Sequence, residues 1–177
     1  MKNQSATALR VGSCAAVFIT LLSSCAEAPW FVFKPADGSF QASFPAEPTK
    51  VIRTVDSTMG ETDVTSYTAT EKQQTFTVAV ADYPAENIEG AGKDKFLDQA
   101  RDVAVEKASG KLQNEKPFDH KGHPGREITI SMSGGKGSYR CRMILVGNRL
   151  YQVIVAGPAD EADARPVTRF LDSFSLS

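Results

Sequence analysis

The chain has 177 residues, of which 41% are hydrophobic and 23% are charged, and its formal net charge is −1. This length falls within the range of one domain, and the composition is that of an ordinary globular protein. A net charge so close to zero excludes a protein that holds nucleic acid through a basic surface. We therefore expect one domain that does not bind nucleic acid.

Residues 1–24 have the three-part pattern of a secretory signal peptide. They begin with a polar segment that contains Lys2 and Arg10 and no acidic residue, and an apolar run follows at residues 11–22. The run is short for a membrane-spanning helix, which needs about 20 apolar residues. The pattern predicts that the chain is exported.

The residues Leu22, Ser23, Ser24 and Cys25 resemble the lipobox of bacterial lipoproteins. The resemblance implies cleavage between Ser24 and Cys25, a diacylglycerol thioether on Cys25, and acylation of its new amino group, for example with palmitate. Several acyl chains anchor a protein durably, whereas one chain alone is marginal. The alternative is a plain signal peptide cleaved within residues 24–28, in which Cys25 has no role.

The lipobox resemblance also implies a location. Ala26 follows Cys25 at the position where enteric bacteria use an aspartate to retain lipoproteins in the inner membrane. We therefore expect a lipid-anchored protein of the bacterial cell envelope, on the outer membrane facing the periplasm rather than on the inner membrane. After cleavage and lipidation Cys141 would be the only free thiol, so no internal disulfide could form.

Residues 25–37 are interpreted as the lipidated cysteine and a tether that becomes a first element, and residues 38–177 as a single domain. The aromatic residues Trp30, Phe31 and Phe33 could touch the membrane, but we expect them to pack under a sheet. Residues 84–92, with two glycines, predict a loop. Alternation of apolar side chains predicts strands before it, at residues 39–44, 51–57, 62–70 and 75–83.

The apolar period becomes helical in residues 93–109, and Gly110 stands just past the end of this predicted helix. A second helix is predicted within residues 162–174, its main part beginning near Pro166. Between the helices, strands joined by short turns are predicted at residues 111–118, 126–133, 138–146 and 150–156. This order predicts an α+β domain with two main helices, near 93–109 and 162–174, and an antiparallel sheet of about six to eight strands.

Three parts of the chain resemble uncharacterised exported bacterial proteins whose domain has the PsbP-like (Mog-type) α/β sandwich fold. The parts are DGSFQASFP at residues 37–45, GHPGRE at 122–127, and LVGNRLYQV at 145–153 followed by FLDSF at 170–174. The resemblance implies this fold and brings no general acid, nucleophile or metal ligand. By analogy of fold alone, it implies a protein that binds or helps to assemble other proteins.

The densest group of candidate ligands is Asp119, His120 and His123, which could begin a metal site. A closed site would need a further ligand from elsewhere, and the nearby glycines and proline favour an exposed loop. We therefore expect no metal and no cofactor. A small-molecule or metal carrier that uses this loop is the alternative function, and a hydrolase with one of these histidines as base is a third.

Two other features have structural interpretations. Cys141 would need a lowered pKa and a nearby base to act as a nucleophile, and we expect it to be buried packing instead. The stretch SGGKGS at residues 133–138 lacks both the spacing and the strand-to-helix context of a phosphate-binding loop. We expect a hairpin turn there.

Four cations, Arg126, Lys136, Arg140 and Arg142, are predicted to lie near one another across neighbouring strands. They form a possible contact surface for acidic groups of a partner or for lipid head groups. The alternative is a solvated sheet face with cross-strand ion pairs, for example with Glu127. The sequence as a whole predicts a membrane-anchored, non-enzymatic envelope lipoprotein that binds or helps to assemble another envelope protein.

Overall fold

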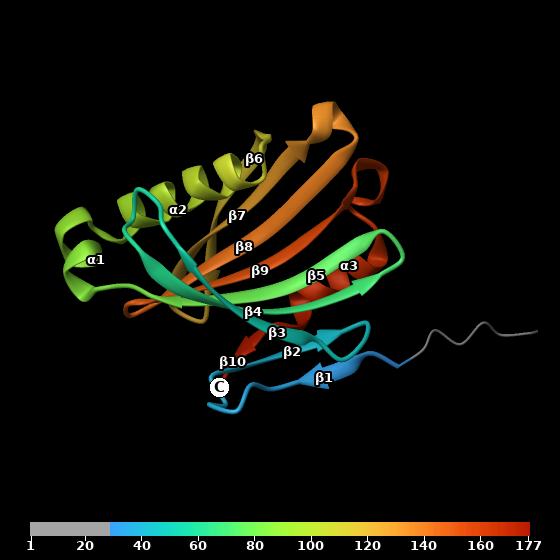
Figure 1. Ribbon diagram of the computed structural model, residues 1–177, viewed down its shortest axis with the longest axis horizontal. Coiled ribbons are helices and arrows are strands. Elements are labelled where there is room, and N and C mark those ends of the chain that lie inside the picture. The colour runs from blue at the N-terminus through green and yellow to red at the C-terminus, as the bar shows by residue number, and fades with distance from the viewer. Residues whose placement is uncertain (1–28) are drawn as a thin grey trace, which may run out of the picture.

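A curved antiparallel sheet of seven strands forms the centre of the molecule (Figure 1). The computed structural model describes residues 29–177, so the predicted signal peptide, Ser24 and Cys25 lie outside the described residues. The order across the sheet is β3 (Thr49–Val55), β4 (Thr62–Glu71), β5 (Gln74–Asp82), β9 (Arg149–Pro158), β8 (Gly137–Val146), β7 (His123–Met132) and β6 (Lys111–His120). β3 and β6 are therefore the edge strands.

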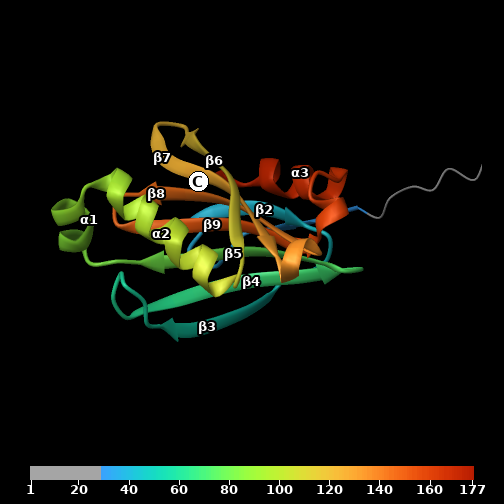
Figure 2. The same ribbon diagram turned by 90° about the horizontal axis from the view of Figure 1, so that it is seen from above.

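Different elements cover the two faces of this sheet (Figure 2). The helix α2 (Lys93–Lys107), which follows the short α1 (Ala85–Ala91), packs over β7 and β8 on one face. The other face carries α3 (Arg165–Ser173) and a small sheet. The small sheet has the order β1 (Phe31–Phe33), β2 (Phe40–Phe44), β10 (Ser175–Leu176), and 3₁₀ turns lie at Ser133–Gly135 and Ala159–Glu161.

Aromatic side chains join the small sheet and α3 to the large sheet. The rings of Phe44 and Phe76 each pack edge-to-face against Phe170 of α3, with centroid distances of 5.0 and 5.4 Å. Phe40 stacks on Phe174 at 5.6 Å and packs against Tyr67 at 5.7 Å. Such pairs add to the free energy gained by burying the rings, so this layer is a strong joint between the two sheets.

A second apolar layer lies between α2 and the opposite face of the large sheet. Helical spacing places Phe96 and Leu97 on the inner side of α2, and both are fully buried. Opposite them, alternation along β7 presents Ile128 and Ile130 to the same layer. The large sheet is thus buried on both faces over its central strands.

The predicted α+β class with an antiparallel sheet is confirmed, and the predicted helices near 93–109 and 162–174 correspond to α2 and α3. Pro166 lies in the first turn of α3, where a missing N–H costs nothing. The large sheet has seven strands, within the expected six to eight. Besides these and the predicted strand β2, the described residues contain two strands that were not predicted. The additional ones, β1 and β10, are too short to show a period in the sequence.

Three local expectations differ from the structure. β1 lies inside the expected tether, at residues 25–37, so the folded part of the chain begins before residue 38. Phe33 and Trp30 pack against the core as expected, whereas Phe31 is exposed. Residues 84–92, expected to be a loop, contain α1, because Ile88 is buried and fixes a helical turn against the core.

Gly110 has a different role from the one its position predicts. The left-handed residue after α2 is Ser109, with φ of 47°. A side chain on Gly110 would come within 2.5 Å of the Ile130 side chain and 2.6 Å of the Ser131 carbonyl oxygen. The glycine is therefore required by the close approach of this segment to β7, and not by backbone conformation.

The aromatic joint predicts the cost of removing one ring. Phe40→Ala should lower the free energy of unfolding by about 3–5 kcal/mol, because it leaves a cavity among Tyr67, Tyr151 and Phe174. Val32→Ala, in the small sheet but 58% exposed, should change it by no more than about 0.5 kcal/mol. Chemical denaturation measures the free energy of unfolding of both variants. An equally small loss in both would contradict the conclusion that these rings join the two sheets.

Candidate functional site

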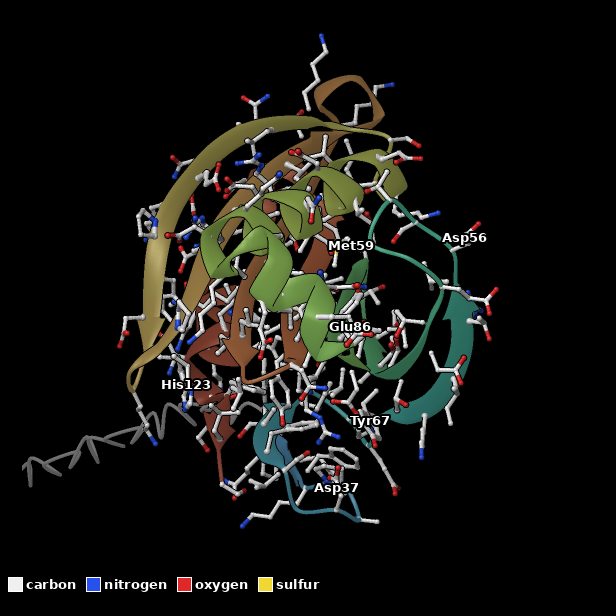
Figure 3. All side chains as sticks on the ribbon, turned by 90° about the vertical axis from the view of Figure 1, so that its left-hand side faces the viewer. Asp37, Asp56, Met59, Tyr67, Glu86 and His123 are labelled. Carbon is white, nitrogen blue, oxygen red and sulfur yellow. The ribbon has the colours of Figure 1, made fainter. Side chains whose placement is uncertain are left out.

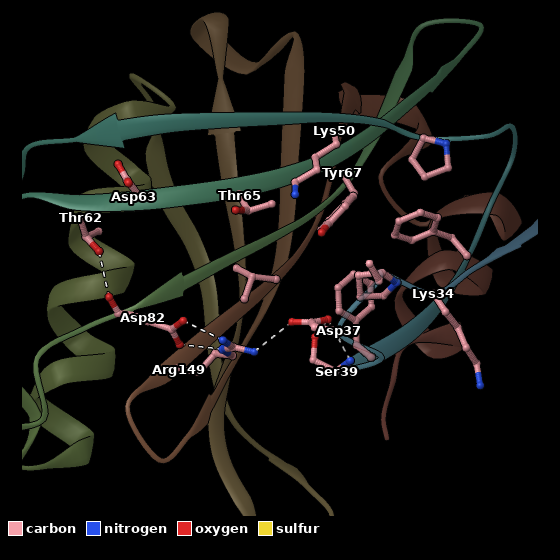
Figure 4. A pocket seen from close by; sticks show the side chains of 16 residues that line it. Lys34, Asp37, Ser39, Lys50, Thr62, Asp63, Thr65, Tyr67, Asp82 and Arg149 are labelled. Atoms are coloured by element: carbon pink, nitrogen blue, oxygen red, sulfur yellow. Dashed lines mark hydrogen bonds and ion pairs between the residues drawn. The ribbon is translucent and has the colours of Figure 1, made fainter.

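A surface groove among residues 29–177 lies between the two sheets (Figure 4). It lies between the turn that joins β1 to β2 and the uncovered end of β4, and its volume is about 610 Å³. Phe33, Phe40, Tyr67 and Val80 give it an apolar floor. We call this concavity the inter-sheet groove.

Strand alternation brings polar side chains to the rim of the inter-sheet groove. Tyr67, Thr65 and Asp63 point to the same face of β4. The register of β3 with β4 places Lys50 opposite Tyr67, so the ammonium group of Lys50 enters the groove from the sheet edge (Figure 4). The groove therefore combines an apolar floor with a cation and hydroxyl groups on one wall.

Arg149 fixes the opposite wall. Its Nε and Nη2 donate to the two carboxylate oxygens of Asp82 at 2.6 and 2.7 Å, and its Nη1 donates to Asp37 at 3.4 Å. These bonds link β9, β5 and the β1–β2 turn, so the guanidinium group clamps the small sheet to the end of the large one. The Arg149 pKa is raised, chiefly by the hydrogen bonds to Asp82.

Asp37 holds the shape of the turn itself. Its Oδ1 accepts hydrogen bonds from the backbone N–H of Ser39 at 3.1 Å and from the Ser39 hydroxyl at 2.8 Å. The backbone hydrogen bond from Ser39 is the main reason that the Asp37 pKa lies below its ordinary value. Burial, and secondarily the negative charge of Asp37, raise the pKa of Tyr67, which therefore keeps its proton as a donor at neutral pH.

The charged side chains that line the inter-sheet groove are three cations and three carboxylates, and only some of them are paired: Lys34, Lys50, Arg149, Asp37, Asp63 and Asp82. Asp37 and Asp82 share the charge of Arg149, whereas Lys50 has no carboxylate partner within residues 29–177. An ammonium group beside a tyrosine hydroxyl and an apolar floor suits a ligand that has both a negative group and an apolar part. The geometry is that of a binding surface.

The candidates at Asp119, His120 and His123 form a tight hairpin rather than the expected loop. β6 ends at His120 and β7 begins at His123, so these two residues are directly paired, and Asp119 accepts a hydrogen bond from the Gly122 N–H at 2.9 Å. His123 lies apart from Tyr67 and Asp37 (Figure 3). Within residues 29–177 no group of three or more His, Cys, Asp or Glu side chains is placed to hold a metal ion.

His120 is part of the aromatic layer rather than of a metal site. Its ring lies 6.1 Å from Phe118 and 5.6 Å from Phe174, and its Nε2 is buried without a hydrogen-bond partner in the described residues. Burial is the main cause that lowers the His120 pKa, and the positive charge of Lys121 adds to it. The neutral ring is therefore the form that this site favours.

The four predicted cations do not form one row. In the register of β7 with β8, Arg126 stands opposite Met143 and points toward α2, where it pairs with Asp94 at 3.1 Å. Side chains alternate between the two faces along β8, so Arg140 and Arg142 point to the face opposite to that of Met143 and Arg126. Lys136 is exposed beside the β7–β8 turn. A single contact surface of all four residues is excluded by this geometry.

Arg140 and Arg142 are bound to Glu127, as the alternative interpretation expects. Arg142 Nε donates to Glu127 at 2.7 Å, Arg140 at 3.2 Å, and Lys116 lies 3.1 Å away. Burial alone would raise the pKa of Glu127, but these partners more than offset it and the pKa lies below its ordinary value. Arg142 also bonds to Asp172 of α3 at 2.7 Å, so this cluster holds the helix to the sheet.

Cys141 and the glycine-rich stretch have the predicted structural roles. Cys141 is fully buried in the layer under α2, and burial raises the pKa of its thiol. The segment Ser133–Gly135 is a 3₁₀ turn between β7 and β8, so this stretch is a hairpin connection. The inter-sheet groove was not predicted, because Asp37 and Arg149 are 112 residues apart and no local pattern joins them.

No protein-family model matches the chain, and no curated protein matches it either. Solved structures do. Cyanobacterial PsbP (CyanoP) from Synechocystis matches with a TM-score of 0.60 and 13% identity over 94% of this chain and 99% of that one. A protein of unknown function from Pseudomonas aeruginosa, PA94, matches with a TM-score of 0.44 and 12% identity, over 82% of this chain and 94% of that one.

A third match, from Bacteroides thetaiotaomicron, has a TM-score of 0.37 and 12% identity, over 86% of this chain and 49% of that one. With TM-scores below 0.5, the second and third matches carry no argument. The first shows that the fold is PsbP-like, which confirms the fold that the sequence resemblance implied. At this identity it shows the fold alone. Within the described residues no helix is long and apolar enough to span a membrane.

The buried His120 ring predicts a pH dependence of stability. Because its pKa is lower in the folded state than in the unfolded chain, the unfolded chain binds the proton more readily, and stability should fall as the pH drops below about 6.5. His120→Phe should remove this part of the pH dependence between about pH 7 and 5. The matched variant His123→Gln should retain it. Denaturant titrations measure the free energy of unfolding at each pH in this range. If this free energy fell with pH as steeply in His120→Phe as in the wild-type chain, His120 would not be the cause of the pH dependence.

Proposed function

We propose that the chain is a lipid-anchored, non-enzymatic module of the bacterial envelope that binds another envelope protein through the inter-sheet groove. The observation that carries the proposal is the groove itself, with an apolar floor, the unpaired Lys50, and a wall fixed by Arg149. A preformed surface of this kind binds with little cost of ordering.

Two further observations support the proposal. The sequence of the first 25 residues resembles a lipoprotein signal, which would place the domain at a membrane surface. The PsbP-like fold is shared with cyanobacterial PsbP over 94% of this chain and 99% of that one. The clustered charges elsewhere, around Glu127, bind one another within the fold and leave the groove as the better candidate for a partner.

The anchor is tested at Cys25. In cells given a radioactive or clickable fatty acid, Cys25→Ser should lose the acyl label and leave the membrane fraction, because a hydroxyl cannot form the thioether. The control variant Cys14→Ser changes a cysteine within the leader and should keep both the label and the membrane location. A Cys25→Ser chain that is still acylated would contradict lipid anchoring at this residue.

The groove is tested by photo-crosslinking in the bacterium that makes the protein. A photoreactive amino acid at Thr65, inside the groove, should give one discrete crosslinked product with an envelope protein that mass spectrometry identifies. The control places the same amino acid at Glu106, on the exposed side of α2. The absence of a product from position 65, or the same products from both positions, would contradict the proposal.

A further inference from the structure

β3 is an open strand edge beside the inter-sheet groove. Its seven residues pair with β4 without a bulge, and the first six are all exposed. The backbone groups on its outer side have no strand to bond to, since β3 ends the seven-stranded sheet. Such an edge can pair with another strand, and proteins usually carry features on their edge strands that hinder this pairing.

The other edge of the same sheet carries features that hinder the pairing of a further strand. β6 contains Pro117, which cannot donate a backbone hydrogen bond, and its register with β7 is interrupted between Leu112 and Asn114. β3 has neither device between Thr49 and Val55. β3 is therefore better able than β6 to pair with an additional strand.

The side chains of β3 alternate between two concavities. Lys50 lines the inter-sheet groove, and Ile52, opposite Thr65, follows it on the same face. Val51 and Arg53 line a second groove, of about 700 Å³, on the other face. Ile52 is 57% exposed and Val51 39%, which are large fractions for aliphatic side chains in a strand. An added strand would find space for its side chains on both faces.

The charges of β3 indicate the chemistry of the occupant. Lys50 and Arg53 have no carboxylate partner among residues 29–177, and β3 contains no acidic residue. A second copy of the chain paired along this edge would gather four cations along one seam with no anion in either strand, which is unfavourable. A strand with carboxylates at the matching positions would pair with both cations instead.

We propose that β3 binds an extended segment of the partner protein as an additional strand, with the pattern acidic-apolar-apolar-acidic. The two acidic residues would lie opposite Lys50 and Arg53, and the two apolar residues opposite Val51 and Ile52. Because the pattern is the same in both directions, it holds for parallel and antiparallel addition alike. This inference rests on the proposed function, since it specifies what the partner presents to the groove and its edge.

The inference is tested with the full chain in detergent micelles and a blocked ten-residue peptide centred on Glu-Val-Val-Glu. Hydrogen–deuterium exchange should slow at least about tenfold in β3 on addition of the peptide, because strand pairing protects the outer amides. Binding of the fluorescently labelled peptide is measured by anisotropy. The control peptide, centred on Lys-Val-Val-Lys, should bind at least about tenfold more weakly.

A charge swap separates this mode of binding from loss of fold. The double variant Lys50→Glu/Arg53→Glu changes only exposed side chains, so it should fold normally. Its preference should be reversed, with the Lys-Val-Val-Lys peptide bound more tightly than the Glu-Val-Val-Glu peptide. Binding without protection of β3, or no reversal in the double variant, would overturn the inference. Protection of β3 that grows with protein concentration and needs no peptide would also overturn it, because the occupant would then be a second copy.

Failure of this inference can be distinguished from failure of the proposed function. If the crosslink from position 65 forms in cells while the peptide neither binds nor protects β3, the groove binds a partner and strand addition at β3 is wrong. If no crosslink forms from position 65 while the peptide still protects β3, the edge binds acidic strands and the groove is not the partner site.

Discussion

The joint between the small sheet and the large sheet is the constraint on which the rest of this structure depends. The rings of Phe40, Phe44, Phe170 and Phe174 place β2 and α3 over one half of the sheet. The small sheet leaves the outer end of β3 and β4 uncovered, and the inter-sheet groove is the space that results. Arg149 then holds the rim by bonding to Asp82 and Asp37 at once.

The same packing explains why the predicted cationic surface does not exist as one unit. A strand alternates its side chains between faces, and the sheet is buried on both faces near β7 and β8. Arg126 is therefore directed to the layer of α2, and Arg142 to that of α3. Buried or half-buried cations need partners, and Asp94, Glu127 and Asp172 supply them. At the groove, Lys34 and Lys50 have no carboxylate partner within residues 29–177, and the sequence singles out neither.

The sequence predicts a helix or strand correctly where the pattern of that element's own residues determines its conformation. Alternation identified the long strands, the helical period identified α2, and Pro166 marked the start of α3. It indicated an element at residues 31–33 but not that it is a strand of the folded domain, and it did not identify α1; both form because Phe33 and Ile88 pack against the core. Gly110 shows the same limit, since only the neighbouring strand reveals why no side chain fits there. The groove depends on contacts across more than 100 residues, and a single sequence carries no signal for them.

The central claim, that the inter-sheet groove is where a partner binds, is tested most directly by filling it. Thr65→Trp places an indole ring in the groove while leaving the aromatic layer and the apolar layer under α2 intact. Membrane extracts of cells that carry wild-type or variant chain can be compared by native electrophoresis, with equal amounts of folded protein. The account predicts that the complex seen with the wild-type chain disappears with Thr65→Trp. A complex of undiminished amount with the filled groove would contradict it.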